Sequence, residues 1–212
     1  MKLGEILLIP TIFIILNLSM NVGVTGYPVF VPYLTEKDGS IVMWESTTIT
    51  YKVVNSLEDD KRFESWASTA FYVWEHKLNG TIDFIEKVQH GDADIKVYVM
   101  HDISEICQND NAVGCMVMET DDHGVINTVE IFTSDRQCTV KTEKFGMQLC
   151  NRVKPQDYKL MILHEIGHAL GLDHANDDLQ KPVSIMYYKL NANMTITDGD
   201  VCAVKLLYER GC

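Results

Sequence analysis

The clearest pattern in the chain is a stripe of apolar residues spaced three and four positions apart between residues 63 and 78. This spacing places the stripe on one face of a helix and predicts an amphipathic helix here. Its members are Phe63, Trp66, Ala67, Ala70, Phe71, Trp74 and Leu78. Asn79-Gly80 follows, and we expect the helix to end there because glycine accepts the left-handed conformation that closes helices. We interpret the aromatic side chains of the stripe as core packing.

Strands are predicted where apolar and polar residues alternate. Ile49, Tyr51 and Val53 alternate with polar neighbours and predict the first strand. Further predicted strands are residues 82–85, 93–99, 112–118 and 125–132. Two aspartates followed by Gly124 separate the last two strands, which is typical of a hairpin turn.

For the part of the chain after residue 132, the sequence pattern predicts a loop and two helices. Residues 133–157 are polar and hold two cysteines, which indicates a disulfide-tied loop. Residues 158–170 are densely apolar and lack helix breakers, so we expect a helix. Thr197-Asp-Gly-Asp200 fits a capping box, and apolar residues on one face follow it at Val201, Val204, Leu207 and Tyr208. This order of elements predicts one domain of the α/β (α+β) class.

The N-terminus carries the longest apolar run, residues 6–24, preceded by Lys2. A positive start, an apolar stretch and then small residues predict a secretory signal over residues 1–26. Two alternatives stay open: an uncleaved signal-anchor in a thin bilayer, and a buried core helix. Residues 27–43 contain prolines and turn residues and are expected to be an extended lead-in. Because a signal and an anchor both export the rest, we expect a secreted or extracellular protein, or a membrane-anchored one that faces outside.

Composition and charge narrow the classes of partner. The chain has 212 residues, 46% hydrophobic and 23% charged, which suits one compact domain with accessory segments. Its formal net charge is −12 and it has no basic stripe, so nucleic acid is not expected as a partner. A single apolar run of near-spanning length excludes a polytopic membrane protein and leaves an uncleaved N-terminal anchor as the means of membrane contact. We expect a monomer.

All six cysteines follow the N-terminal apolar run, and their even number favours disulfide bonds in an exported chain. The sequence does not fix the pairing, although neighbours in sequence would close the shortest loops. Those pairs are Cys107–Cys115, Cys138–Cys150 and Cys202–Cys212. The rival interpretation is a thiolate zinc site, which lacks a CxxC pair to support it.

The segment HEIGHALGLDH at residues 164–174 carries the chemistry. His164 and His168 are one helical turn apart, so both imidazoles project from one face and each can give zinc a nitrogen. Gly171 lets the backbone turn sharply and bring His174 round as a third ligand. Three protein ligands leave a fourth position for water, which marks a catalytic zinc. The alternative interpretation is three histidines that cap or pack around a helix.

Glu165 lies beside the first of these histidines. Its carboxylate can reach water at the metal rather than the metal itself, which predicts Glu165 as the catalytic general base. The motif is a metalloprotease signature. Met186 follows in the segment Ser-Ile-Met-Tyr-Tyr, and with it the chain resembles the metzincin clan of zinc peptidases, whose Met-turn places a methionine beneath the metal.

Within this clan the chain resembles the matrixins, the family of matrix-metalloprotease catalytic domains. HEIGHALGLDH is nearly the matrixin form, and four weaker matches support it. They are Trp44…Ile49-Thr-Tyr51, Ala70-Phe-Tyr-Val-Trp74, Gly91-Asp-Ala-Asp-Ile95 and Thr197-Asp-Gly-Asp…Leu207-Tyr208. The resemblance implies a metallopeptidase domain over residues 44–212, with a twisted five-stranded mixed sheet, three helices and a zinc cleft.

Several residues depart from the matrixin pattern. Ala175 stands where matrixins usually have serine, and Tyr187 and Tyr188 keep only part of the Pro and Tyr that wall the specificity pocket. The structural zinc and calcium loops of the family are not recognisable. His101 and His123 could belong to a second Zn²⁺ or a Ca²⁺ site, although lone surface histidines beside aspartates are more often solvated.

Latency is the other departure. Matrixins typically hold an upstream cysteine on the zinc, whereas no cysteine here precedes Cys107, and residues 27–43 are too short for an ordinary prodomain. The resemblance therefore implies an enzyme that is synthesised in its active form, or one whose activity is blocked by a separate protein inhibitor.

The sequence thus predicts an exported zinc endopeptidase that hydrolyses peptide bonds in extracellular proteins. We expect a protein or peptide substrate to add as a strand along residues 112–118. One rival is a non-catalytic exported zinc-binding or adhesion module, which would not require the intact Glu165. Another is an exopeptidase with the same fold. Asn79-Gly-Thr81 and Asn193-Met-Thr195 fit the glycosylation acceptor pattern.

Overall fold

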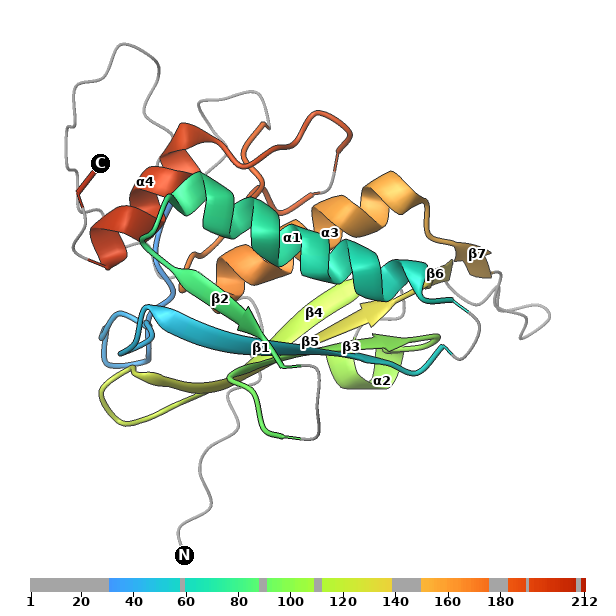
Figure 1. Cartoon of the computed structure of the whole chain (residues 1–212), viewed down its shortest axis with the longest axis horizontal. Coiled ribbons are helices and arrows are strands. Elements are labelled where there is room, and N and C mark those ends of the chain that lie inside the picture. Colours follow the sequence, from blue (N-terminus) through green and yellow to red (C-terminus); the bar gives the residue numbers. More distant parts are fainter. Residues whose placement is uncertain are drawn as a thin grey trace, which may run out of the picture.

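The structure is a computed structural model that describes residues 31–57, 60–87, 91–108, 112–138, 150–175, 183–189, 191–208 and 211–212. One sheet lies below three long helices in the view of Figure 1. In chain order the elements are β1 (Thr48–Asn55), α1 (Arg62–Leu78), β2 (Asp83–Glu86), β3 (Ile95–Met100), α2 (Ser104–Cys107), β4 (Gly114–Thr120), β5 (Ile126–Ser134), β6 (Arg136–Cys138), β7 (Cys150–Arg152), α3 (Pro155–Ala169) and α4 (Asp198–Leu207).

The main sheet has five strands in the order β2-β1-β3-β5-β4. β1, β2, β3 and β5 run parallel, and β4 pairs antiparallel with β5 through the predicted hairpin. Gly124 turns this hairpin with φ +82°. The predicted mixed five-stranded sheet is therefore confirmed, and β4 is its last strand on that side in the described part of the chain.

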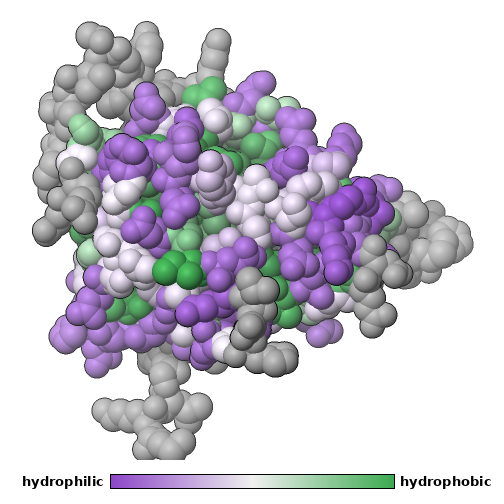
Figure 2. Space-filling model, in the orientation of Figure 1, coloured by the Kyte–Doolittle hydropathy of each residue, from purple (hydrophilic) through white to green (hydrophobic). Residues whose placement is uncertain are grey.

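The core lies between the sheet and the helices. Along β3, buried residues alternate with half-buried ones, so Ile95, Val97 and Val99 face the helices with no exposed surface. From α1, Phe71 and Trp74 are equally buried, which confirms the predicted apolar face. On the face of the molecule that Figure 2 shows, hydrophilic side chains are interspersed with smaller hydrophobic areas.

The predicted loop over residues 133–157 is wrong at both ends, whereas its middle, residues 139–149, lies outside the described residues. β5 continues to Ser134, β6 and β7 form a two-stranded antiparallel ribbon, and α3 begins at Pro155 rather than at residue 158. Proline at the first helical position fits because its φ is preset for the helix and its missing N–H would have no intrahelical partner. Apolar density, which marked the start at Tyr158, begins one turn later than the helix itself.

Two of the three expected disulfides are present. Cys107–Cys115 joins the single turn of α2 to β4, and Cys202–Cys212 joins α4 to the C-terminal residues. The third pairing needs the side chain of Cys138, which lies outside the described residues, although Cys138 and Cys150 face each other in register.

The predicted signal or anchor, residues 1–26, lies outside the described residues as well. Among the helices that are described, none combines the length and the apolar character needed to cross a bilayer.

Candidate metal centre

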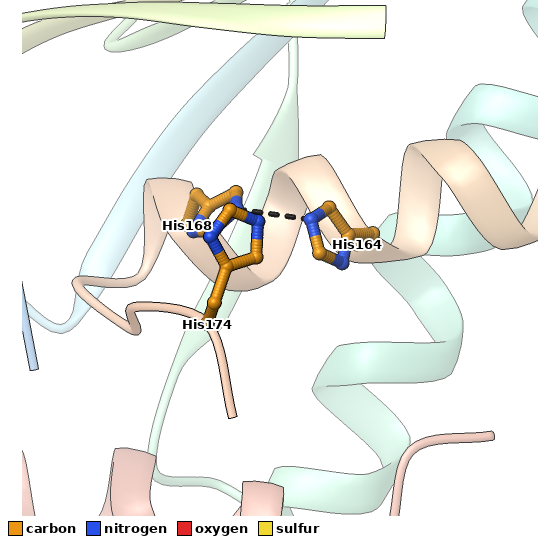
Figure 3. Close-up of side chains that lie close together, drawn as sticks. All are labelled: His164, His168 and His174. Atoms are coloured by element: carbon orange, nitrogen blue, oxygen red, sulfur yellow. Dashed lines mark hydrogen bonds between the residues drawn. The ribbon is translucent and has the colours of Figure 1, made fainter. Parts of the chain in front are cut away.

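α3 and the turn that follows it bring three histidines together. His164 and His168 project from the buried face of α3, with 8% and 9% of their surface exposed. Gly171 then adopts φ +94°, a conformation that favours glycine, and the chain reverses so that His174 returns to the same place. One ring nitrogen from each of the three histidines lies within 4.8 Å of the others. Figure 3 shows the three rings converging from α3 and from the segment after it.

The two α3 histidines are oriented by backbone carbonyl groups. His164 Nδ1 lies 2.7 Å from the Ile185 carbonyl oxygen, and His168 Nδ1 lies 2.7 Å from that of Leu172. A carbonyl oxygen can only accept, so both Nδ1 atoms carry the proton, and both Nε2 atoms are left with a lone pair. These Nε2 atoms face each other at 3.0 Å. Two lone pairs at that distance repel unless a cation lies between them, so the donor set fits a metal ion.

Burial also sets the protonation of these rings. It lowers the pKa of His164 to about 4, and it lowers the pKa of His168 and of His174 as well. The histidines are therefore neutral at physiological pH, which is the form that binds metal. Glu165, 8% exposed on the same helix, responds in the opposite direction, since burial raises the pKa of its carboxyl group to about 8.

The predicted Met-turn residue lies against α3. Met186 is fully buried, and a Cβ atom added at Gly167 would lie only 2.2 Å from its sulfur atom. The Met186 carbonyl oxygen accepts a hydrogen bond of 2.8 Å from the amide of Ala175, the residue after the third histidine. This turn, called the Met-turn below after the predicted residue, therefore touches both the helix and the segment that carry the three histidines.

A buried carboxylate on α4 holds the Met-turn in place. Asp200 is fully buried, and its Oδ1 accepts a 2.6 Å hydrogen bond from Ser184 Oγ. Ser184 Oγ in turn accepts a 3.0 Å hydrogen bond from the Met186 amide. The second oxygen of Asp200 accepts hydrogen bonds from the Thr197 backbone amide and from Thr197 Oγ1, which completes the predicted capping box. One side chain thus caps α4 and fixes the turn whose Ile185 carbonyl orients His164.

Glu165 faces the start of β4. A Cβ atom added at Gly114 would lie 3.2 Å from Glu165 Oε1 and 2.4 Å from the sulfur of Met161, one turn earlier on α3. Glycine therefore leaves the space that these two side chains fill. The carboxylate is consequently close to the last strand of the sheet.

Comparison with known proteins identifies the family of the chain. The family model for matrixins matches residues 43–209 of the chain. The chain belongs to the matrixin family. It is also 26% identical over 190 residues to the interstitial collagenase of Bos taurus, a match that covers 86% of this chain and 36% of the collagenase. The chain thus spans little more than a third of the length of that relative.

The matrixin family is one of zinc metallopeptidases, and the three histidines of the motif form a group that could hold the metal. In the described residues this is the single group of three or more such side chains with converging ligand atoms. His101 instead contacts Asp135, with Nδ1 2.8 Å from Oδ1, and the exposed His123 lies in the turn between β4 and β5. Within the described residues, neither histidine belongs to a second group of potential metal ligands.

Sequence reasoning missed the groups that orient the histidines of this matrixin. The Ile185 and Leu172 carbonyl groups are backbone atoms, which no residue pattern can identify. The capping box indicated Asp200 as a helix cap only. Its contact with Ser184 crosses 16 residues of sequence and depends on where α4 packs.

Proposed function

We propose that the chain is an exported zinc endopeptidase whose metal is held by His164, His168 and His174 and whose general base is Glu165. The observation that carries this proposal is the pair of Nε2 lone pairs at 3.0 Å, with both Nδ1 protons committed to carbonyl oxygens. Zinc, when bound there, supplies a Lewis acid that polarises a substrate carbonyl group and lowers the pKa of water. The family match supports zinc in particular.

Glu165 is the group that moves the proton. Its carboxylate takes a proton from the attacking water and delivers it to the leaving amine, which is general acid–base catalysis. Burial alone raises the pKa of this carboxyl group to about 8, and a nearby cation would lower that pKa toward neutrality. A base with a pKa near the working pH can both accept and return a proton, as the two steps require.

β4 offers a backbone edge for an extended substrate. Ser134 N donates to Val113 O, so by the alternation of an antiparallel pair Cys115 faces β5, while the amide and carbonyl groups of Gly114 and Met116 face away from it. A substrate strand that paired with these groups would place a peptide bond beside Glu165, since Gly114 and Glu165 are neighbours. Backbone pairing of this kind accepts many sequences, which supports protein substrates in general.

Export is supported by the two described disulfides, because such bonds persist in oxidising compartments. The signal over residues 1–26, the domain over residues 44–212, and the monomeric state remain predictions. A protein inhibitor that controls the enzyme also remains a prediction.

The test combines metal analysis with cleavage of a generic quenched peptide, on protein secreted under oxidising conditions. We expect about one zinc per chain and cleavage that a chelator abolishes and added zinc restores. Product lengths from a denatured protein separate the two peptidase types, since an endopeptidase makes internal cuts and an exopeptidase trims from one end.

Other results would contradict the proposal in different ways. Folded protein without zinc would contradict the metal centre. One zinc per chain without cleavage of any of several unrelated proteins would favour the non-catalytic binding module.

A further inference from the structure

The described part of the lead-in, residues 31–43, is paired with the turn that carries the metal ligands. Tyr33 forms an antiparallel β-bridge with Leu172. On one side of this bridge the Leu34 amide donates to the Gly171 carbonyl oxygen at 2.9 Å, and on the other the Asp173 amide donates to the Pro32 carbonyl oxygen at 2.8 Å. The lead-in thus holds the peptide groups on both sides of Leu172.

Leu172 itself faces the opposite way, toward α3. Its amide donates to the Gly167 carbonyl oxygen at 3.1 Å, and its carbonyl oxygen is the acceptor for His168 Nδ1. Backbone groups alternate in direction along an extended chain, so the Gly171 carbonyl and the Asp173 amide meet the lead-in, while the Leu172 amide and carbonyl groups meet α3. The lead-in therefore fixes the acceptor that orients the second histidine, and it also fixes Asp173, which immediately precedes the third.

The lead-in is itself anchored in the body of the protein. Val31 and Val42 are 5% and 2% exposed and belong to the main core. The Val42 amide donates to the Leu34 carbonyl oxygen, which closes the lead-in into a hairpin. A Cβ atom at Gly171 would lie 2.5 Å from the Val42 carbonyl oxygen. The glycine of the motif is thus needed for the close approach of the lead-in as well as for its positive φ.

We propose that residues 31–43 are a positioning segment for the metal centre, with the Leu34 amide as one of the groups through which it acts. The inference rests on the proposed zinc site and deepens it. The segment holds the Gly171–Asp173 backbone so that His168 keeps its Nε2 lone pair aimed at the ion and His174 stays within reach. Outer groups that orient metal ligands typically change metal affinity 10–100-fold when they are lost.

The test compares Leu34→Pro, which removes the N–H donor, with Leu34→Ala, which removes the same side chain but keeps the donor. Zinc dissociation constants are measured by competition with a chromophoric chelator, beside the melting temperature of each zinc-free protein and the cleavage rate at rising zinc concentration. We expect Leu34→Pro to bind zinc at least about tenfold more weakly than Leu34→Ala. Its zinc-free melting temperature should match that of Leu34→Ala, and excess zinc should restore its cleavage rate.

Equal zinc affinity in the two variants would overturn the proposal. Absence of zinc and cleavage from the unmodified protein would instead contradict the proposed function itself. If Leu34→Pro does not fold, amide hydrogen exchange in the unmodified protein decides the question. Leu34 and Asp173 amides that exchange as slowly as the hydrogen-bonded Leu170 amide at the C-terminal end of α3 support the pairing, and exchange as fast as the exposed turn at His123 contradicts it.

Discussion

The two ends of α3 handle ionisable groups in opposite ways. Just before its first turn, Arg152 binds Asp60, which also binds Arg62 at the start of α1; the two arginine side chains are 58% and 60% exposed. Beside its last turns, His164 and Glu165 are each only 8% exposed. The described hydrogen bonds of the His164 and His168 rings are with backbone carbonyl groups and with each other.

This difference distinguishes a structural use of charge from a functional one. At the first end, Asp60 has two charged partners and keeps its ordinary ionised form, because the hydrogen bonds from Arg62 lower the pKa of its carboxyl group to about 2. At the other end, burial without an opposite charge shifts the pKa of Glu165 up and that of His164 down, so both neutral forms are favoured. Without a metal ion, such a cluster of buried ionisable groups lowers the stability of the fold. A bound cation supplies the positive charge that the cluster lacks.

The largest difference is expected when one acid at each end of α3 is neutralised. Glu165→Gln should keep zinc and lower kcat by roughly 10²–10⁴-fold, because the proton acceptor is lost while the ligands remain. Zinc content and kcat are measured together.

Asp157→Asn is the matched control, since Asp157 is an exposed acid in the first turn of α3. It should leave kcat unchanged. Substantial cleavage by Glu165→Gln would remove Glu165 from the proposed role.

A smaller effect is expected at Asp200, a buried acid whose carboxyl group has hydrogen-bond partners. Asp200→Asn turns an acceptor for Ser184 and Thr197 into a group that presents N–H donors to other donors, and we expect a loss of about 1.5–3 kcal/mol in the free energy of unfolding. Zinc affinity should fall with it, because the Met-turn carries the carbonyl group that orients His164. Urea unfolding of the zinc-free protein and chelator competition measure the two effects.

Asp198→Asn provides the control on the same helix turn. Asp198 is exposed, so its loss should cost no more than about 0.5 kcal/mol through the helix dipole. Similar costs for the two variants would show that the Asp200 contact with the Met-turn contributes nothing.

The smallest effect is expected at the ion pairs of Asp60 with Arg62 and Arg152. Asp60→Asn should lower the melting temperature only slightly at neutral pH, and added salt should reduce the difference. The pKa of Asp60 is lower in the folded state than its ordinary value of 3.8, so its contribution is present above pH 4 and is lost as the pH falls through about 2.

Thermal melts of both proteins between pH 2 and 7 test this expectation. The two curves should converge toward pH 2. A difference that grows on acidification would contradict the ion pair as its source.

Local patterns predicted most of the elements. The apolar spacing located α1, alternation located the strands, and the turn chemistry at Gly124 identified the one antiparallel hairpin of the sheet. The sequence does not predict the ribbon of β6 and β7, because three-residue strands are too short to show an alternating pattern. The start of α3 was placed late because the pattern used was apolar density, whereas Pro155 was the better signal.

The sequence by itself determined which side chains meet at the candidate metal centre, because helical geometry puts His164 and His168 on one face and Gly171 lets the chain return to His174. The tertiary structure decided how those side chains are held. The groups that orient them are the carbonyls of Ile185 and Leu172, the Asp200 carboxylate behind the Met-turn, and the lead-in that pairs with Leu172. These contacts join segments far apart in sequence and are made mostly by backbone atoms, which every residue carries. A residue pattern therefore cannot reveal them, whereas the packing of α3, α4 and the lead-in brings them together.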